Sequence, residues 1–164
     1  MRFCCFLALL LPAVAFASPE DDVGRVLDTF HQAAANSDYD KYFNQFASDG
    51  VFLGTDASER WDVEAFKRYA KPAFDAGRGW RYKPRERHVT ISEDGRYAWF
   101  DEVLVNSSLG LCRGDGVLEQ QQGEWKIRAY NLTMLVPNEI ALDVGRQTMK
   151  VDGLAAEPND MANE

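Results

Sequence analysis

The sequence predicts an α+β fold in which N-terminal helices pack on a strongly curved antiparallel sheet. Apolar residues recur at helical spacing through the first part of the chain, and after Gly79 the pattern changes to the alternation of β-strands. Helices followed by a run of strands are typical of an α+β domain whose helices lie on one face of a sheet.

The first 17 residues have the pattern of a secretory signal peptide. Arg2 supplies the positive charge, an apolar stretch follows it, and Ala15 and Ala17 place small residues at the positions that define cleavage. We expect cleavage after Ala17 and export to the periplasm or the medium. The uncharged stretch is shorter than the roughly 20 residues of a membrane-spanning helix, so we expect no membrane contact after the signal is removed.

Three helices are predicted in the first half of the chain. The first covers residues 20–35, because an acidic first turn precedes apolar residues at helical spacing. A second, short helix follows Asp38 and carries Phe46 toward the core, before a strand at residues 51–53. After a polar loop, Asp62 is a good N-cap for the third helix.

Four long strands are predicted in the second half, in an antiparallel meander. They cover residues 80–92, 96–106, 109–121 and 124–135. These elements form one domain, residues 18–137. Residues 138–164 are a C-terminal extension that begins with a weak helical pattern, and we expect its last dozen or so residues to be disordered.

Composition and charge restrict the partners of this domain. The chain of 164 residues is 46% hydrophobic and 27% charged, which is typical of one soluble globular domain. Its net charge of −8 opposes binding to phosphate backbones, and the basic cluster of residues 78–87 is interleaved with aromatic side chains. We therefore expect no nucleic acid as a partner.

Four motifs carry a family resemblance. They are GTDASERW at 54–61, AWFDE at 98–102, RGDGVL at 113–118, and WKI with YNLT between 125 and 133. These motifs and the order of elements resemble bacterial SnoaL-like domain proteins of the nuclear transport factor 2-like superfamily. That superfamily also includes ketosteroid isomerase, scytalone dehydratase and polyketide cyclases.

The resemblance implies a cystatin-like cone in which the helices close one end and the sheet surrounds an interior pocket. It implies a small, largely apolar or aromatic ligand, and a homodimer that forms through the outer face of the sheet. The same cone holds isomerases, dehydratases, cyclases, ligand binders and association domains, so the fold does not determine the function.

Either Asp101 or Glu102 points into the pocket, because neighbouring side chains on a strand face opposite sides. A carboxylate in an apolar cone has a raised pKa and can act as a general base, as one does in ketosteroid isomerases. We choose Asp101 as the candidate base. Arg113 on the neighbouring strand is the candidate partner for Asp101 or for an anionic ligand group.

The last strand offers a hydrogen-bond donor near that carboxylate. The resemblance favours Asn131 as the inward residue, with Tyr130 packed outward at a dimer interface. The opposite orientation, with Tyr130 inside as an oxyanion donor, stays open and favours isomerase-type chemistry. The ligand itself is expected against four aromatic side chains, Trp61, Phe74, Trp80 and Trp99.

No metal and no cofactor are expected. His31 and His88 each lack a second histidine at ligand spacing, and the chain has no phosphate-binding loop or dinucleotide fingerprint. Three functions remain compatible with these residues. They are binding of a small apolar or aromatic molecule, cofactor-free isomerase, dehydratase or cyclase chemistry, and protein association through the exposed sheet and the acidic tail.

Overall fold

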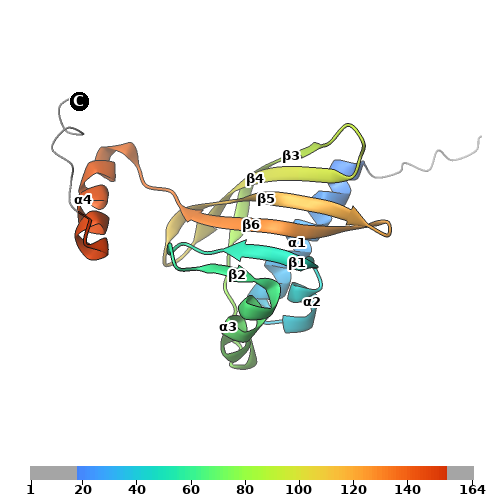
Figure 1. Ribbon diagram of the computed structural model, residues 1–164, viewed down its shortest axis with the longest axis horizontal. Helices are drawn as coiled ribbons and strands as arrows, with labels where there is room; N and C mark the ends of the chain where they lie inside the picture. The colour runs from blue at the N-terminus through green and yellow to red at the C-terminus, as the bar shows by residue number, and fades with distance from the viewer. Residues whose placement is uncertain (1–17, 155–164) are drawn as a thin grey trace, which may run out of the picture.

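A computed structural model describes residues 18–154 of the chain. The predicted signal peptide and residues 155–164 of the predicted extension lie outside the described residues. Figure 1 shows three helices gathered on one face of a curved sheet, with a fourth helix standing apart from it. The predicted α+β fold class is confirmed.

The first helix, α1 (Pro19–Ala35), begins at Ser18 as N-cap. Ser18 and Asp21 form a capping box, since each side chain accepts a hydrogen bond from the other residue's backbone N–H. The acidic first turn also complements the helix dipole. The side chains that α1 buries belong to Val23, Leu27, Phe30, His31, Ala33 and Ala34.

The next segment divides differently from the prediction. Helix α2 (Tyr39–Phe43) is short, and Phe46, expected on this helix, instead begins strand β1 (Phe46–Leu53). The position of Phe46 fits both helical spacing and a strand start, so the sequence pattern could not separate the two. Pairing decides it, because Phe46 lies opposite Ile127 of the last strand.

The polar loop after β1 ends in a strand that the sequence did not reveal. Strand β2 (Arg60–Asp62) is only three residues long and pairs antiparallel with β1. Helix α3 (Val63–Asp75) then starts at the predicted cap, where the Asp62 side chain accepts a backbone N–H at 2.7 Å. After α3 the chain turns at Gly77, whose φ of 67° suits a residue without a side chain.

The second half forms the predicted antiparallel meander. Its strands are β3 (Lys83–Ile91), β4 (Tyr97–Asn106), β5 (Gly110–Gln121) and β6 (Glu124–Met134). The order in the sheet is β2-β1-β6-β5-β4-β3, and β1 runs parallel to β6. The sheet is therefore mixed, whereas a wholly antiparallel sheet was predicted. Trp80 precedes β3 instead of belonging to it.

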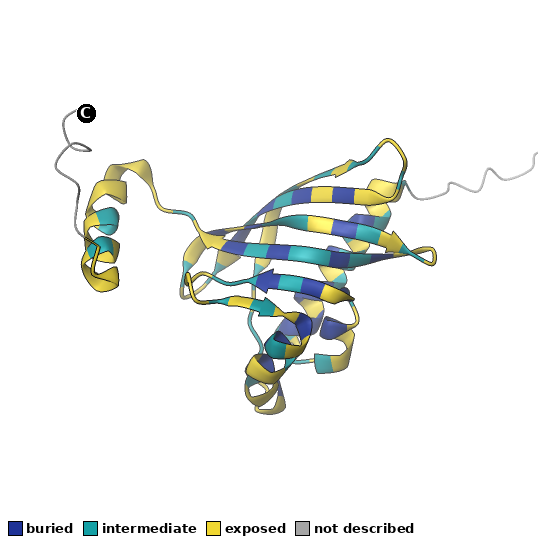
Figure 2. Cartoon of the chain, in the orientation of Figure 1, coloured by how far each residue is buried: buried dark blue, intermediate teal, exposed yellow. Residues whose placement is uncertain are grey.

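The sheet has an inner face toward the helices and an outer face away from them. Along β4, Ala98, Phe100, Glu102 and Leu104 are buried on the inner face, and the residues between them point outward. Figure 2 shows this alternation of buried and exposed positions along the strands. The inner face is where the sheet can contribute to a site.

A β-bulge interrupts the alternation in β6. Val117 of β5 lies opposite Ala129, and the next residue, Leu118, lies opposite Ile127, so Arg128 is an extra residue in β6. As a result, Ile127 and Tyr130 are both buried, although an odd and an even position on a regular strand would face opposite sides. Gly116 permits this close approach, since a Cβ there would overlap the Ala129 carbonyl oxygen.

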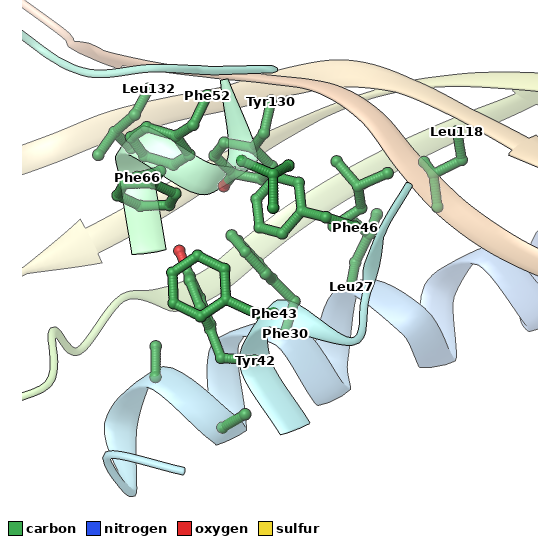
Figure 3. Packing of buried hydrophobic residues seen from close by; sticks show 14 of the residues in the cluster. Leu27, Phe30, Tyr42, Phe43, Phe46, Phe52, Phe66, Leu118, Tyr130 and Leu132 are labelled. Atoms are coloured by element: carbon green, nitrogen blue, oxygen red, sulfur yellow. The ribbon is translucent and has the colours of Figure 1, made fainter. Parts of the chain in front are cut away.

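The core between the helices and the sheet is rich in aromatic residues. Phe30 of α1 stacks on Tyr42 of α2 with ring centroids 4.5 Å apart, and Phe52 of β1 stacks on Phe66 of α3 at 4.1 Å. Figure 3 shows these side chains filling the space beneath the sheet. This aromatic core surrounds the site described below.

Beyond β6 the chain leaves the core. A 3₁₀ turn, η1 (Asn138–Ile140), leads into helix α4 (Ala141–Asp152), and neither element buries a side chain. Figure 1 shows α4 at a distance from the sheet. Between residues 18 and 154, no helix combines the length and apolar character that crossing a bilayer requires.

Candidate functional site

A cavity of about 170 Å³ lies between the helices and the inner face of the sheet. Its walls are mainly aromatic, and the sheet contributes Phe52 and Tyr130 while α3 contributes Phe66 and Tyr69. The most exposed wall residues, Thr55 and Tyr69, mark its mouth, and the buried ones form its interior.

One wall is a stack of parallel rings. The ring of Phe66 is nearly parallel to those of Phe52, at 4.1 Å, and Trp61, at 5.5 Å, and Trp61 is stacked in turn on Tyr69 at 4.5 Å. These residues come from β1, β2 and α3, which are consecutive in the chain and pair locally. The three-residue strand β2 thus fixes Trp61 at the cavity.

A fully buried carboxylate stands behind the cavity. Glu102 is 0% exposed, and its Oε1 atom lies 2.6 Å from Nε2 of His31 and accepts a hydrogen bond from the Tyr130 hydroxyl group at an O···O distance of 3.0 Å. Its Oε2 atom accepts from Nε of Arg87 at 2.8 Å. Both oxygens are therefore satisfied, as a buried charge requires.

These partners determine the protonation of the group. Burial disfavours the ionised form of Glu102, but the hydrogen bonds and charges of His31 and Arg87 outweigh burial and hold the pKa of the carboxyl below its usual value. Burial and the adjacent carboxylate raise the pKa of the Tyr130 hydroxyl well above its ordinary value. Glu102 is thus anionic and Tyr130 is a protonated donor.

Arg87 links this network to the surface. Its NH1 atom donates to the carbonyl oxygen of Gly24 at 3.1 Å and to the carboxylate of Asp28 at 2.8 Å, both on α1. The NH2 atom of Arg87 is buried without a hydrogen-bond partner among the described residues. Arg87 therefore ties α1 to the sheet through Glu102 and holds the carboxylate in place.

His31 is the member of the network that can act on a ligand. Both His31 and Tyr130 line the cavity. In its neutral form His31 donates its Nε2–H to Glu102, which leaves the lone pair of Nδ1 as a proton acceptor. A carboxylate that orients an imidazole in this way is a common arrangement for a general base.

The structure shows that Asp101, the chosen candidate base, does not face the cavity. Asp101 lies on the outer face of the sheet, and Glu102 is the carboxylate that points inward. Arg113 is also exposed on that outer face, and no ion pair between Asp101 and Arg113 occurs among the described residues. Neither residue reaches the cavity, because the register of β4 turns the even-numbered positions toward the helices.

Trp99 and Asn131 were also predicted on the wrong face. Trp99 is 51% exposed on the outer face. Asn131 donates to Asp115 of β5 at 3.1 Å on that same face, while Tyr130 occupies the inner position. The family resemblance favoured Asn131 as the inward residue, but the bulge at Arg128 puts Tyr130 on the same face as Ile127.

The remaining predicted residues lie at or near the cavity. Trp61 and Trp80 line it, and Trp80 donates its Nε1–H to the Tyr42 hydroxyl at 3.4 Å. Phe74 is buried one layer behind, with its ring centroid 5.2 Å from that of Trp80. Phe74 therefore supports the wall without lining it.

Sequence reasoning missed His31 and Arg87. His31 lies at the edge of the apolar stripe of α1, four positions after Leu27, where a polar residue is equally compatible with exposure. Arg87 belongs to a basic cluster that gave no sign of an inward role. Among residues 18–154, no group of three or more His, Cys, Asp or Glu side chains is arranged to hold a metal ion.

The sequence and fold were compared with known proteins. The SnoaL-like domain family matches residues 23–137. The chain belongs to the SnoaL-like domain family. No curated protein matches this SnoaL-like chain significantly by sequence.

Solved structures with low sequence identity share the fold of this SnoaL-like domain. An NTF2-like protein of unknown function from Pseudomonas putida has a TM-score of 0.61 at 12% identity, covering 73% of this chain and 89% of its own. A cystatin-like protein of unknown function from Nostoc punctiforme has a TM-score of 0.57 at 17% identity, with coverages of 71% and 90%.

A third similar structure carries a provisional activity. The Novosphingobium aromaticivorans protein, provisionally described as a scytalone dehydratase, has a TM-score of 0.61 at 10% identity and covers 71% of this chain and 83% of its own. At such identities the similarity establishes the fold alone. The function has to be argued from the cavity.

Proposed function

We propose that this SnoaL-like domain binds a small molecule of about the size of one substituted aromatic ring. The observation that carries this proposal is the cavity of about 170 Å³ with aromatic walls. An apolar cavity of about 150 Å³ in another protein accommodates benzene, so the volume suits a single ring with small substituents. Aromatic walls with a few polar groups are the usual form of such a site.

Native mass spectrometry of the protein purified from its own host tests this proposal. We expect one small molecule per chain, released and identified after denaturation. If the protein is isolated empty, titration calorimetry with benzyl alcohol replaces this measurement, and we expect saturable binding. An empty protein that also fails to bind benzyl alcohol contradicts the proposal.

A second function, proton abstraction from the bound molecule, is favoured by the pair of His31 and Glu102. Nδ1 of His31 accepts a proton from an acidic C–H group of the ligand, and the electron pair left on carbon is delocalised onto an adjacent carbonyl oxygen. Glu102 stabilises the resulting imidazolium without touching the ligand, so it is a positioning residue. This step needs no cofactor, and it is common to isomerisation, dehydration and cyclisation.

Deuterium exchange into phenylacetone, a ketone with one ring and acidic C–H groups, tests this second function. We expect the wild-type protein to accelerate exchange and His31→Gln to abolish the acceleration. His88→Gln is the matched control, because His88 is exposed on β3 and does not line the cavity. Equal exchange rates with wild-type protein and with His31→Gln contradict a base role for His31.

The outer face of the sheet supports the proposal of a homodimer. It exposes the large apolar side chains of Trp99, Val105, Leu111 and Val117. The face also carries both signs of charge, since exposed Arg113 lies near Asp101 and Asp115 in the register of the sheet. A two-fold axis can therefore set Arg113 of one copy against a carboxylate of the other.

Analytical ultracentrifugation tests the dimer. We expect a dimer for the wild-type protein and a folded monomer for Trp99→Lys, because a buried lysine at that interface is unfavourable. A wild-type monomer contradicts the homodimer and favours the remaining hypothesis, association of this face with a different protein.

Export is also a proposal supported by the sequence of residues 1–17, and a mature N-terminus at Ser18 in host-purified protein is its test.

A further inference from the structure

The residues that line the cavity carry an excess of negative charge. Among the described residues that line it, none is Lys or Arg, and Glu59 is the one acidic residue. The other nearby carboxylate, Glu102, is already paired with His31 and Arg87 behind the wall. Glu59 is therefore the uncompensated charge of this site.

The loop before β2 holds Glu59 at the mouth of the cavity. The backbone N–H of Gly54 donates to the carbonyl oxygen of Glu59 at 2.8 Å, which closes the loop. The Glu59 side chain crosses over Gly54, where a Cβ atom would overlap it, and its Oε2 atom accepts the N–H of Asp56 at 3.3 Å. These contacts within the loop therefore fix the position of the Glu59 carboxylate.

One oxygen of this carboxylate remains available. Glu59 forms no ion pair within residues 18–154, and its Oε1 atom has no hydrogen-bond partner there. Burial raises the pKa of the lining residue Tyr82 to about 12, and the nearby Cys112 and Glu59 add to this shift. An unpaired carboxylate beside aromatic walls attracts a cation and repels an anion.

The aromatic walls of the cavity also favour a positively charged ligand. Trp61, Tyr69, Trp80 and Tyr82 all line the cavity with Glu59. The face of an aromatic ring attracts a cation, and rings grouped with a carboxylate are a known arrangement for recognising ammonium groups. Arg113, the predicted partner for an anionic ligand, lies on the other face of the sheet.

We propose that the ligand of this cavity is a small organic cation, with one ring and a protonated amine, whose ammonium group is bound by Glu59 at the mouth. This inference rests on the proposed binding function and adds the charge class of the ligand. Glu59 is the residue that selects the charge, and the ring stack of Phe52, Phe66 and Trp61 binds the apolar part.

Three probes of similar shape and different charge test the inference by titration calorimetry. They are benzylamine, which is a cation at neutral pH, benzyl alcohol, which is neutral, and benzoate, which is an anion. We expect benzylamine to bind roughly tenfold more tightly than benzyl alcohol, and benzoate to bind least. The preference for benzylamine should decrease as salt is added.

Two variants separate the charge of Glu59 from other effects. Glu59→Gln should lose the preference for benzylamine and keep the affinity for benzyl alcohol. Glu64→Gln removes an equivalent charge from the first turn of α3, outside the cavity, and should keep the preference. Thermal unfolding of each variant verifies that the fold is retained.

The outcomes distinguish this inference from the proposed function. If benzyl alcohol binds as tightly as benzylamine, the cationic ligand is excluded and the binding cavity stands. If the preference survives in Glu59→Gln, the selecting charge is not Glu59. If none of the three probes binds to the wild-type protein, the binding function and the inference both fail.

Discussion

Nε2 of His31 and Oε1 of Glu102 lie 2.6 Å apart, although 71 positions separate them in the chain. The contact joins the first helix to the centre of strand β4 and is buried on both sides. Arg87 strengthens this link between helix and sheet, because it donates hydrogen bonds to Glu102 and to the carbonyl oxygen of Gly24 on the same helix. One carboxylate therefore both docks α1 on the sheet and orients the imidazole at the cavity.

Replacing Glu102 tests this structural role. Glu102→Gln removes the buried anion that His31, Arg87 and Tyr130 share and leaves Arg87 with Asp28 alone, so we expect a loss of roughly 3–5 kcal/mol in the free energy of unfolding. Asp101→Asn is the matched control, since the neighbouring carboxylate lies on the outer face, and we expect a change within about 0.5 kcal/mol. Urea unfolding followed by circular dichroism measures both, and equal effects would contradict the buried network.

The same carboxylate makes stability depend on pH. The pKa of Glu102 lies below its ordinary value in the folded protein, so the ionised form stabilises the fold. This contribution is fully present above the unfolded pKa, near the ordinary value of 4.5, and is lost as the pH falls through the folded pKa. The groups that face Glu102 are His31 from α1, Arg87 from β3 and Tyr130 from β6.

We therefore expect the stability difference between wild type and Glu102→Gln to be nearly constant above about pH 5 and to shrink at lower pH. Urea unfolding of both proteins across this range measures the difference. Hydrogen bonds from neighbouring serine residues also lower the pKa values of the exposed Asp56 and Asp94. Both proteins contain these residues, so their contribution to the pH dependence cancels in the difference. A difference that widens toward low pH would show that Glu102 is not the stabilising anion.

The sequence alone predicted the fold class and the four long strands, because these follow from local periodicity and from turn residues. It also established that Asp101 and Glu102 face opposite sides of their strand. Which side is inner depends on register and on the packing of α1, and neither is encoded within the strand. Only the pairing of Glu102 with His31 and Arg87, far away in sequence, decides it.

The last strand is a second case in which the local sequence did not determine which residues face the helices. A regular strand would put Asn131 on the same face as Ile127, and the family resemblance also favoured Asn131 as the inward residue. The extra residue at Arg128 shifts the phase, so Tyr130 takes the inner position. A signal was present in Gly114 and Gly116, which indicate a bulge or close approach on the neighbouring strand, but glycines alone do not say which strand carries the extra residue.

The bulge leads to a prediction about Gly116. A Cβ at this position would overlap the carbonyl oxygen of Ala129, which belongs to backbone and cannot turn aside. We expect Gly116→Ala to lower the free energy of unfolding by about 1–3 kcal/mol. Gly145→Ala, in helix α4, is the control, because a Cβ there meets open space and suits a helix. Thermal unfolding should show a loss for the first variant and none for the second.

Closing the mouth of the cavity tests whether ligands enter there. Thr55 is an exposed residue of the loop before β2 and lines the cavity, whereas Ser58, on the same loop, is exposed and does not line it. Thr55→Trp places a large ring over the opening and should weaken benzyl alcohol binding by at least about tenfold, with little change in the unfolding temperature, since surface substitutions cost little.

Ser58→Trp adds the same ring outside the opening, so we expect its affinity for benzyl alcohol to match that of the wild type. Titration calorimetry on the two variants gives the comparison directly. If both bind as the wild type does, the probe reaches the protein by another route or at another site. If both lose binding equally, the loop as a whole is disturbed, and the opening beside Thr55 is not the feature that admits the ligand.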